Sequence, residues 1–334
     1  MLLRERGERV AAAALRLWPG GEARSCCSPT ALQRARACAH ALGLSFEEID
    51  DEERFLRLVI EPFVAGYLAG LTPNPCVVCN RFRLADLVAR ARHRGLGRVA
   101  TGHYARLVWH HDEPFVARAT HLDKDQSYML WQVAPETLAR LQFPLGELDK
   151  GTVREFAAKA GLPVAEQPES QEACFAPAGY RRFLQQWGVE ARPGLIVTAG
   201  GRSVGTHQGQ WDFTVGQRRG LGVASAAPLY VLARRGETNE VVVGPRERLM
   251  VRSFTLDDVI DRGLGDGQGL VVQLRYRSAA VPVRHLTPAF GGGLRVELVT
   301  PFEGVAPGQS AVFYDGDRVI GGGVIGEGSY DTLP

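Results

Sequence analysis

The chain has 334 residues, a length at which two or three domains are expected. Its 45% hydrophobic and 23% charged residues are typical of a globular protein, and a net charge of +2 does not by itself indicate a nucleic-acid binder. Six cysteines are too few for a disulfide scaffold in so long a chain, so they are structural thiols, metal ligands or reactive groups.

The sequence shows no membrane or export signal. No run of apolar residues approaches the roughly 18 to 20 that are needed to cross a bilayer. The arginine-rich start lacks an apolar signal core followed by a cleavage site. We therefore expect a cytoplasmic protein with no membrane partner.

The first half of the chain has the pattern of an α/β layer fold, because residues 10–175 alternate helix-like segments with short apolar segments. Ser28-Pro29 is typical of a helix start, apolar residues recur after it at helical spacing, and Gly43 ends the run. A second helix is predicted over residues 82–93.

A buried strand is predicted over residues 98–100, and its carboxyl end carries Gly102 and His103 into a loop. Ligands usually bind at such strand ends in open α/β sheets, so these two residues are well placed for binding. Further on, Thr152 has the spacing of a capping box and predicts a helix that ends at Gly161.

The last third of the chain has a different pattern, with short alternating strands separated by glycine and proline. A helix start near Tyr180 precedes it. A strand is predicted over residues 271–277, and Asp315-Gly316 is a strong hairpin signal. This part is therefore predicted to be a small β-barrel or sandwich.

Two thiols lie close together in Cys76-x-x-Cys79, after a Pro-Asn-Pro turn and before the helix predicted from residue 82. A helix N-terminus favours the thiolate, the reactive form of cysteine, through its dipole. Catalysis, binding of a metal or cluster, and structural burial all remain open for this pair.

The other cysteines are more ambiguous. A lone cysteine such as Cys174 is usually a small buried hydrophobe, and that interpretation is favoured over a reactive thiol for this residue taken alone. Cys26, Cys27 and Cys38 are interpreted as structural, Cys38 because it lies within a predicted helix.

Three polar segments are candidates for binding, each with an ordinary alternative. Residues 124–128 mix charge and amide, which fits either a solvated loop or a phosphate or base contact. His103 fits a core histidine equally well. Arg218 and Arg219 lie in a glycine-rich loop that allows a phosphate chain to approach closely, although this signal is weak alone.

Taken together, these segments resemble the tRNA-specific 2-thiouridylase family (MnmA), whose members install sulfur at the wobble uridine of certain tRNAs. Nine segments match in the same order along nearly the whole chain, and any one of them alone could be chance. They are residues 15–18, 72–75 with Cys79-Asn80, 100–104, 124–128, 143–147, Cys174-Phe175, 214–222, 275–277 and 307–314.

The resemblance implies a three-domain architecture. Residues 1–180 would form a PP-loop ATPase-type domain, with the parallel sheet of the adenine nucleotide alpha hydrolase-like fold. Residues 181–248 would form a small central tRNA-binding domain, and residues 249–334 a C-terminal β-barrel that grips tRNA.

The resemblance also implies roles for individual residues. Cys79 matches the family nucleophile, and Cys174 matches the cysteine that carries a transferable persulfide. Leu15 and Gly102 match contacts with ATP, the Mg²⁺-dependent cofactor. The residues that match contacts with tRNA or the target base are Asn74, Pro75, Cys76, His103, Lys124, Asp125, Gln126, Arg275, Tyr276 and Gln309.

The implied reaction explains why two thiols are needed. ATP adenylates the C2 oxygen of uridine 34, so that AMP departs in place of hydroxide. Cys79 then attacks the persulfide on Cys174, which releases sulfide and leaves a Cys79–Cys174 disulfide that must later be reduced. A sulfur-carrier protein would recharge Cys174.

The chain departs from the family pattern at its beginning. The family's Ser-Gly-Gly-x-Asp-Ser phosphate loop has no counterpart here. Residues 1–7 resemble the end of the helix that follows this loop, so about 20 residues, including one strand, are expected to be missing before Met1. We expect a misplaced start codon, and negligible ATP-dependent activity if the chain begins at Met1. An ATP-inactive, tRNA-binding remnant is the alternative.

A second departure is Cys76, where many members carry aspartate. It creates three candidate thiolates, Cys76, Cys79 and Cys174, and related PP-loop tRNA thiolases hold a [4Fe-4S] cluster with three cysteines. A cluster therefore rivals the persulfide relay. A zinc- or cluster-bearing redox protein unrelated to RNA is a further alternative, which the ordered tRNA-contacting segments disfavour.

Overall fold

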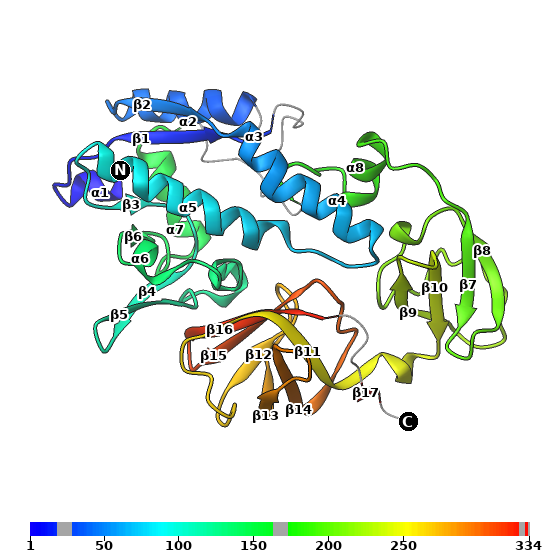
Figure 1. Cartoon of the computed structure of the whole chain (residues 1–334). Coiled ribbons are helices and arrows are strands. Elements are labelled where there is room, and N and C mark those ends of the chain that lie inside the picture. The colour runs from blue at the N-terminus through cyan, green and yellow to red at the C-terminus, as the bar shows by residue number, and fades with distance from the viewer. Residues whose placement is uncertain (19–28, 163–172, 327–330, 333–334) are drawn as a thin grey trace. The chain divides into compact units, whose positions relative to one another are not determined.

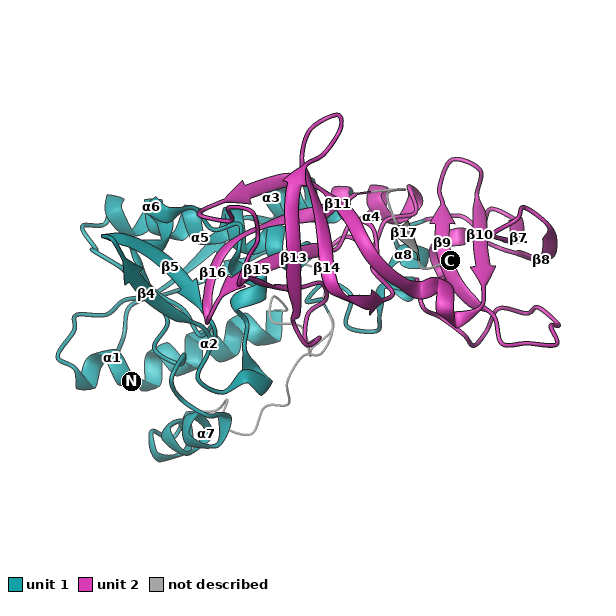
Figure 2. Cartoon of the chain, turned by 90° about the horizontal axis from the view of Figure 1, so that it is seen from below, with its two compact units in different colours: residues 1–61, 75–188 teal, residues 62–74, 189–334 magenta. Residues whose placement is uncertain are grey.

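A computed structural model of the chain describes residues 1–18, 29–162, 173–326 and 331–332. These residues divide into two compact units, which Figure 2 distinguishes by colour. Unit 1 comprises residues 1–61 and 75–188, and unit 2 comprises residues 62–74 and 189–334. Cys26, Cys27 and Ser28, to which the sequence assigns roles, lie outside the described residues.

Unit 1 contains two parallel strand pairs and one hairpin. In the first pair Leu15 lies opposite Ile49, and the helix α2 runs along this pair (Figure 1). The second pair joins β3 to β6. The strands are β1 (Ala12–Arg16), β2 (Phe46–Asp50), β3 (Val99–Ala100), β4 (Arg106–His110), β5 (Glu113–Ala117) and β6 (Leu141–Gln142), and β4 and β5 form the antiparallel hairpin.

Helices surround these strands in unit 1, and their fully buried side chains, such as Phe55, Leu84 and Leu130, form its core. No helix among the described residues is long and apolar enough to cross a membrane. The helices are α1 (Leu2–Glu5), α2 (Pro29–Ala41), α3 (Glu52–Phe55), the π-helix η1 (Leu56–Ile60), α4 (Glu61–Leu68, which continues into unit 2), α5 (Pro75–His93), η2 (Leu122–Lys124), η3 (Ser127–Leu130), α6 (Pro135–Leu138), α7 (Lys150–Lys159) and α8 (Tyr180–Gln186).

Each of the four predicted helices has a counterpart in the structure, α2, α5, α7 and α8, with two corrections. The helix predicted from residue 82 begins seven positions earlier, at Pro75, because a proline in the first turn lacks only an N–H that would have no helical partner there. The cap of α7 is Asp149, whose carboxylate accepts a hydrogen bond from the amide of Thr152 at 2.9 Å. Thr152 is therefore inside the helix and does not cap it.

Unit 2 contains two separate sheets. The first has the order β8-β7-β10-β9, with only β7 and β10 parallel. In the second, β11-β14-β13-β12-β15-β16 closes into a barrel because β16 also pairs with β11. The bounds are β7 (Gly194–Thr198), β8 (Ser203–His207), η4 (Gln210–Asp212), β9 (Tyr230–Arg235), β10 (Glu240–Gly244), η5 (Arg246–Leu249), β11 (Met250–Asp261), β12 (Val271–Gln273), β13 (Val281–Pro288), β14 (Leu294–Glu303), β15 (Ser310–Asp315), β16 (Arg318–Ile325) and β17 (Asp331–Thr332).

The closed barrel confirms the predicted β-structure of the last third and selects a barrel over a sandwich. The hairpin at Asp315-Gly316 is confirmed, and Gly316 has the positive φ of 57° that such a turn requires. The strand predicted over residues 271–277 ends at Gln273, because the chain turns at Arg277, where φ is +63°. The three-domain boundaries at 180/181 and 248/249 remain predictions.

Candidate functional site

The helix α5 carries two of the predicted site cysteines in its first two turns. Cys76 is partly buried, and Cys79 is buried, with 8% of its surface exposed. Both cysteines are thiols in this structure. The sequence places them in a loop before the helix, whereas the structure places them on a rigid element whose N-terminal dipole favours a thiolate.

Asn80 fixes the position of Cys79 within unit 1. Its side chain is buried, its Nδ2 donates to the carbonyl of Met129 at 3.1 Å, and its Oδ1 accepts from Arg83 at 2.7 Å. Met129 belongs to η3, which follows the predicted tRNA-contacting loop. The side chain next to Cys79 therefore ties the cysteine helix to that loop.

Asp125 points into the protein and holds this loop in shape. Its Oδ1 accepts from the amides of Ala119 and Ser127 at 2.8 and 3.1 Å, and its Oδ2 accepts from the Ser127 hydroxyl at 2.7 Å. Arg118 lies 3.6 Å from the same carboxylate. These contacts give Asp125 an internal role, and its predicted contact with tRNA stays a prediction, as does that of Lys124.

Gln126 joins the loop to the residues that follow β3. Its side-chain Oε1 accepts from the amide of Tyr104 at 2.9 Å, and its own amide donates to the carbonyl of Tyr104 at 2.8 Å. Gly102 and His103 directly precede Tyr104. Three predicted site segments, 79–80, 102–104 and 124–126, are thus brought together in unit 1 by hydrogen bonds through Asn80 and Gln126.

His103 is a neutral imidazole at the centre of this arrangement. Its Nδ1 shares a hydrogen bond of 2.8 Å with the hydroxyl of Thr101, and its ring meets the edge of Phe143 at 6.0 Å. Burial, aided by the positive charge of Arg83, lowers the pKa of His103 to about 3. His103 can therefore offer hydrogen bonds at neutral pH, but it cannot supply a proton as an acid.

The two residues predicted to contact ATP both lie at or just after the end of a strand in unit 1. Leu15 is partly buried near the carboxyl end of β1. Gly102 is exposed, and a Cβ placed there would meet no atom closer than the Leu145 Cδ1 at 3.8 Å, so packing alone does not demand glycine. A bare backbone at this position leaves room for a ligand to approach closely.

Cys174 is partly buried and lies next to a firmly anchored aromatic ring. The ring of Phe175 packs against those of Phe55 at 5.9 Å and Phe183 at 4.8 Å, and Trp18 packs against Phe183 at 6.0 Å. This cluster fixes the backbone on one side of Cys174. The residues on its other side, 163–172, lie outside the described part of the chain.

The cysteines in the described part of the chain do not belong to a group that could hold a metal ion. Among the described residues, no group of three histidine, cysteine, aspartate or glutamate side chains could hold a metal ion. Cys76, Cys79 and Cys174 all belong to the described residues and are thiols. The iron–sulfur alternative therefore has no support in the structure.

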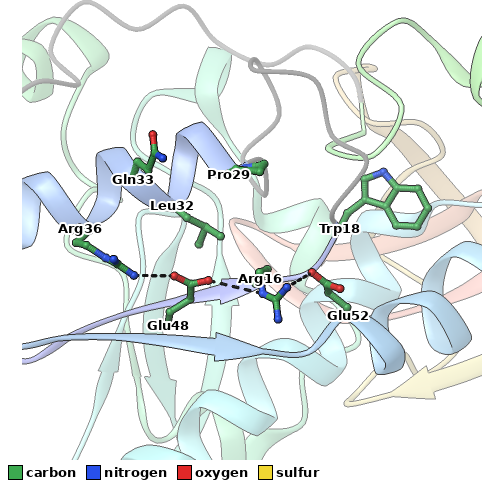
Figure 3. Close-up of a pocket in the computed structure, with 8 residues that line it drawn as sticks. All are labelled: Arg16, Trp18, Pro29, Leu32, Gln33, Arg36, Glu48 and Glu52. Atoms are coloured by element: carbon green, nitrogen blue, oxygen red, sulfur yellow. Dashed lines mark hydrogen bonds and ion pairs between the residues drawn. The ribbon is translucent and has the colours of Figure 1, made fainter.

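A cavity of about 300 Å³ lies beside the ends of β1 and β2, and its lining includes Arg16 and Trp18 of the matched segment 15–18 (Figure 3). Arg16 lies 2.8 Å from Glu52 and 3.6 Å from Glu48, while Arg36 lies 2.9 Å from Glu48. These acids would repel a phosphate chain and already compensate the two arginines. The lining residues are Arg16, Trp18, Pro29, Leu32, Gln33, Arg36, Glu48 and Glu52.

Of the residues in unit 2 that are predicted to contact tRNA, some have exposed side chains and one has a side chain that points inward. Arg275 is exposed, and its guanidinium donates to the carbonyl of Gly304 at 2.9 Å. The ring of Tyr276 is partly exposed and is covered by the guanidinium of Arg277 at 5.2 Å. Gln309 points inward and donates to the carbonyl of Thr72 at 2.6 Å.

Three family models match successive parts of the chain. The model described as tRNA methyl transferase HUP domain matches residues 1–178. The tRNA methyl transferase PRC-barrel domain matches residues 181–245, and the aminomethyltransferase beta-barrel domain matches residues 261–325. Together they agree with the α/β domain and the two β-rich parts that the sequence predicts.

Curated proteins are similar over nearly the whole chain. The bifunctional protein NifU/MnmA of Rubrobacter xylanophilus is 46% identical over 97% of this chain and 66% of its own length. The tRNA-specific 2-thiouridylases MnmA of Leptospira biflexa and Rhodopseudomonas palustris (strain BisB18) are 40% and 43% identical. These matches cover 98% and 97% of this chain, and 90% and 85% of the two relatives.

Proposed function

Since this chain belongs to the tRNA-specific 2-thiouridylase (MnmA) family, we propose that it is a tRNA sulfurtransferase that acts on C2 of the wobble uridine, U34. The arrangement that best supports this activity is the corner of unit 1 in which Cys79, His103 and Gln126 are drawn together by Asn80 and Tyr104. We also propose the division into domains at 1–180, 181–248 and 249–334, which the three family models support.

In the proposed reaction ATP, bound with Mg²⁺, supplies the adenylyl group that turns the C2 oxygen of uridine into a leaving group. Leu15 and Gly102 would lie against the nucleoside of ATP. Asn74, Pro75 and Cys76, at the start of α5, would contact the flipped target base, which must leave its stack at a cost of a few kcal/mol. Neutral His103 would offer a hydrogen bond without transferring a proton.

The sulfur atom would reach C2 through two cysteines. Cys174 carries it as a persulfide, and the Cys79 thiolate attacks the Sγ of Cys174. The persulfide S–S bond breaks, hydrosulfide leaves and attacks C2, and AMP departs. The two cysteines are oxidised to a disulfide as the sulfane sulfur is reduced. A cellular thiol then reduces the disulfide, and a persulfide-bearing carrier protein recharges Cys174.

Two further features follow from the residues present. Cys76 stands where many family members carry aspartate, so a thiol or a water must move protons at that position. Exposed Arg275 and the neighbouring Tyr276 would meet the tRNA together with Lys124, because arginine and lysine neutralise phosphates and an aromatic ring can stack on bases. Asp125 and Gln126 would support the loop of Lys124 from within unit 1, and Gln309 would support the backbone of Thr72 within unit 2.

The proposal is tested in a strain that lacks the gene, complemented with the gene and its upstream region, so that any phosphate-loop codons are included. The complementing copies carry Cys79→Ser, Cys174→Ser or, as a control, Cys38→Ser. Cys38 lies in α2, and burial raises the pKa of its thiol, so it should be inert. We expect no 2-thiouridine in tRNA with either site variant, and normal levels with the control, measured by mass spectrometry. Thiolation with Cys79→Ser or Cys174→Ser at the control level would remove that residue from the mechanism.

A further inference from the structure

Residues 62–74 leave unit 1 and belong structurally to unit 2. The chain enters this excursion within α4 and returns at Pro75, the first residue of the cysteine helix α5. The segment that delivers Cys76 and Cys79 to unit 1 is therefore held by the other half of the protein. The side chains that hold it come from sequence positions more than 130 residues away.

Gln210 holds the end of α4. Its side chain is 2% exposed, and its Nε2 donates to the carbonyls of Tyr67 at 2.8 Å and Leu68 at 2.9 Å. The last carbonyls of a helix have no partner within the helix, so this amide satisfies two of them and fixes where the helix stops.

Arg234 holds the residues that follow. It is 7% exposed, and its guanidinium donates to the carbonyl of Leu71 and to the hydroxyl of Thr72, the latter at 2.9 Å. It also covers the ring of Tyr67 at 5.2 Å. A buried cation needs such hydrogen bonds because removing it from water is costly, so its contacts with residues 67–72 are strongly constrained.

Gln309 completes the arrangement from the barrel. Its Nε2 donates to the carbonyl of Thr72 at 2.6 Å, while the amide of Thr72 donates to the carbonyl of Pro307 at 2.7 Å. Gly308 between them has a φ of +83°, and a Cβ there would lie 2.9 Å from the Leu71 Cβ. Thr72 is thus held by hydrogen bonds to its backbone amide, its backbone carbonyl and its side-chain hydroxyl.

The link from Thr72 to the cysteine helix is short and stiff. Pro73 and Pro75 have fixed φ angles, and the Pro73 ring packs where a Cβ on Gly66 would have to lie, at 2.5 Å. Few backbone angles are therefore free to vary between Thr72 and the first residue of α5.

We propose that Gln210, Arg234 and Gln309 are positioning residues for sulfur transfer, acting through residues 67–72 on the helix that carries Cys79. They touch neither the reacting sulfur atoms nor ATP. The expected effect on turnover rests on the proposed function, whereas the expected effect on the mobility of residues 67–72 rests on the contacts alone. It gives Gln309 a role that differs from the direct tRNA contact that the family resemblance implies.

The first test compares Arg234→Met with Arg234→Lys and with the control Arg235→Met. Arg235 lies next along β9, is exposed and pairs with Glu240. In Arg234→Met, the rate of amide hydrogen exchange in peptides covering residues 66–72 should increase. The kcat should fall about tenfold or more, while the KM for tRNA should stay within twofold of the wild-type value. Arg234→Lys, which can still donate, should recover part of both. Exchange equal to that of Arg235→Met would overturn the proposal.

The second test compares Gln309→Ala with the control Gln268→Ala. Gln268 is exposed, and its side chain donates a hydrogen bond to exposed Asp266. We expect faster exchange in residues 66–72 and a lower kcat in Gln309→Ala, with an unchanged Kd for tRNA. A raised Kd with unchanged exchange and kcat would establish a direct tRNA contact and refute the positioning role. Exchange is measured without tRNA or ATP, so it is informative even if the enzyme activity proves to be different.

Discussion

Replacing Asp125 by alanine should destabilise unit 1, because the carboxylate is the acceptor around which the loop after β5 is built. The substitution leaves the amides of Ala119 and Ser127 without their acceptor in a buried environment. Each unsatisfied buried donor costs about 1 to 3 kcal/mol, so we expect a loss of about 4 kcal/mol in the free energy of unfolding. Asp125→Asn keeps an acceptor for both amides and should cost about 1 to 2 kcal/mol.

The assay is urea unfolding followed by tryptophan fluorescence, since four of the five tryptophans, Trp18, Trp109, Trp131 and Trp187, lie in unit 1. The midpoint for Asp125→Ala should fall by about 1 to 2 M. Asp123→Ala is the matched control, because it removes the same charge from an exposed position two residues away. A wild-type midpoint for Asp125→Ala, combined with weaker tRNA binding than in the control, would refute the internal role and favour direct contact.

Two further outcomes are expected from the same corner of unit 1. Gly102→Ala should be as stable as the exposed control Gly97→Ala, since a Cβ at Gly102 meets nothing closer than 3.8 Å. It should nevertheless raise the KM for ATP, and an unchanged KM would exclude the predicted ATP contact. Because the pKa of His103 is lowered to about 3, the unfolded chain binds a proton below about pH 6.5 that the folded chain does not, so stability is lost as pH falls. When the pH falls from 7.5 to 5.5, the free energy of unfolding of the wild type should decrease by about 1.4 kcal/mol more than that of His103→Gln, as measured by urea unfolding. Equal decreases would show that the pKa of this imidazole is not lowered in the folded protein.

The elements that sequence predicted well depend on neighbouring residues. α2 ends at Ala41 because Gly43 adopts a φ of +62°, which glycine permits at no steric cost. The hairpin at Asp315-Gly316 likewise follows from two adjacent residues. Such signals are complete within a few positions, so no tertiary contact is needed to interpret them.

The start of α5 shows how a local signal can mislead. Pro73 and Pro75 together indicate a turn, yet Pro75 is the first residue of the helix, where its missing N–H has no cost. The burial of Val77, Leu84 and Val88 at spacings of seven and four residues shows that a helical pattern was present. Weighing that spacing above the prolines would have placed both cysteines on the helix.

The direction of a polar side chain was beyond the sequence. Asp125 and Gln309 match family positions associated with tRNA, but sequence reveals only their residue types. Their partners, Ala119 and Thr72, are brought to them by the folded chain, and Thr72 lies 237 residues from Gln309. Nothing near Gln309 in the sequence distinguishes an amide that faces a substrate from one that holds a backbone carbonyl.

Because these side chains point inward, substitutions far from the reacting sulfur atoms should also affect turnover. Asn80 holds the cysteine helix from inside unit 1, through Met129, and the grip on Thr72 holds its leading segment from unit 2. A nucleophile must reach its target within a fraction of an ångström, so loosening either support should reduce turnover as surely as a change near the sulfur atoms. Because Arg234 and Gln309 belong to unit 2 and hold the segment that leads into α5, substitutions far from Cys79 in the sequence should reduce turnover without touching a sulfur atom.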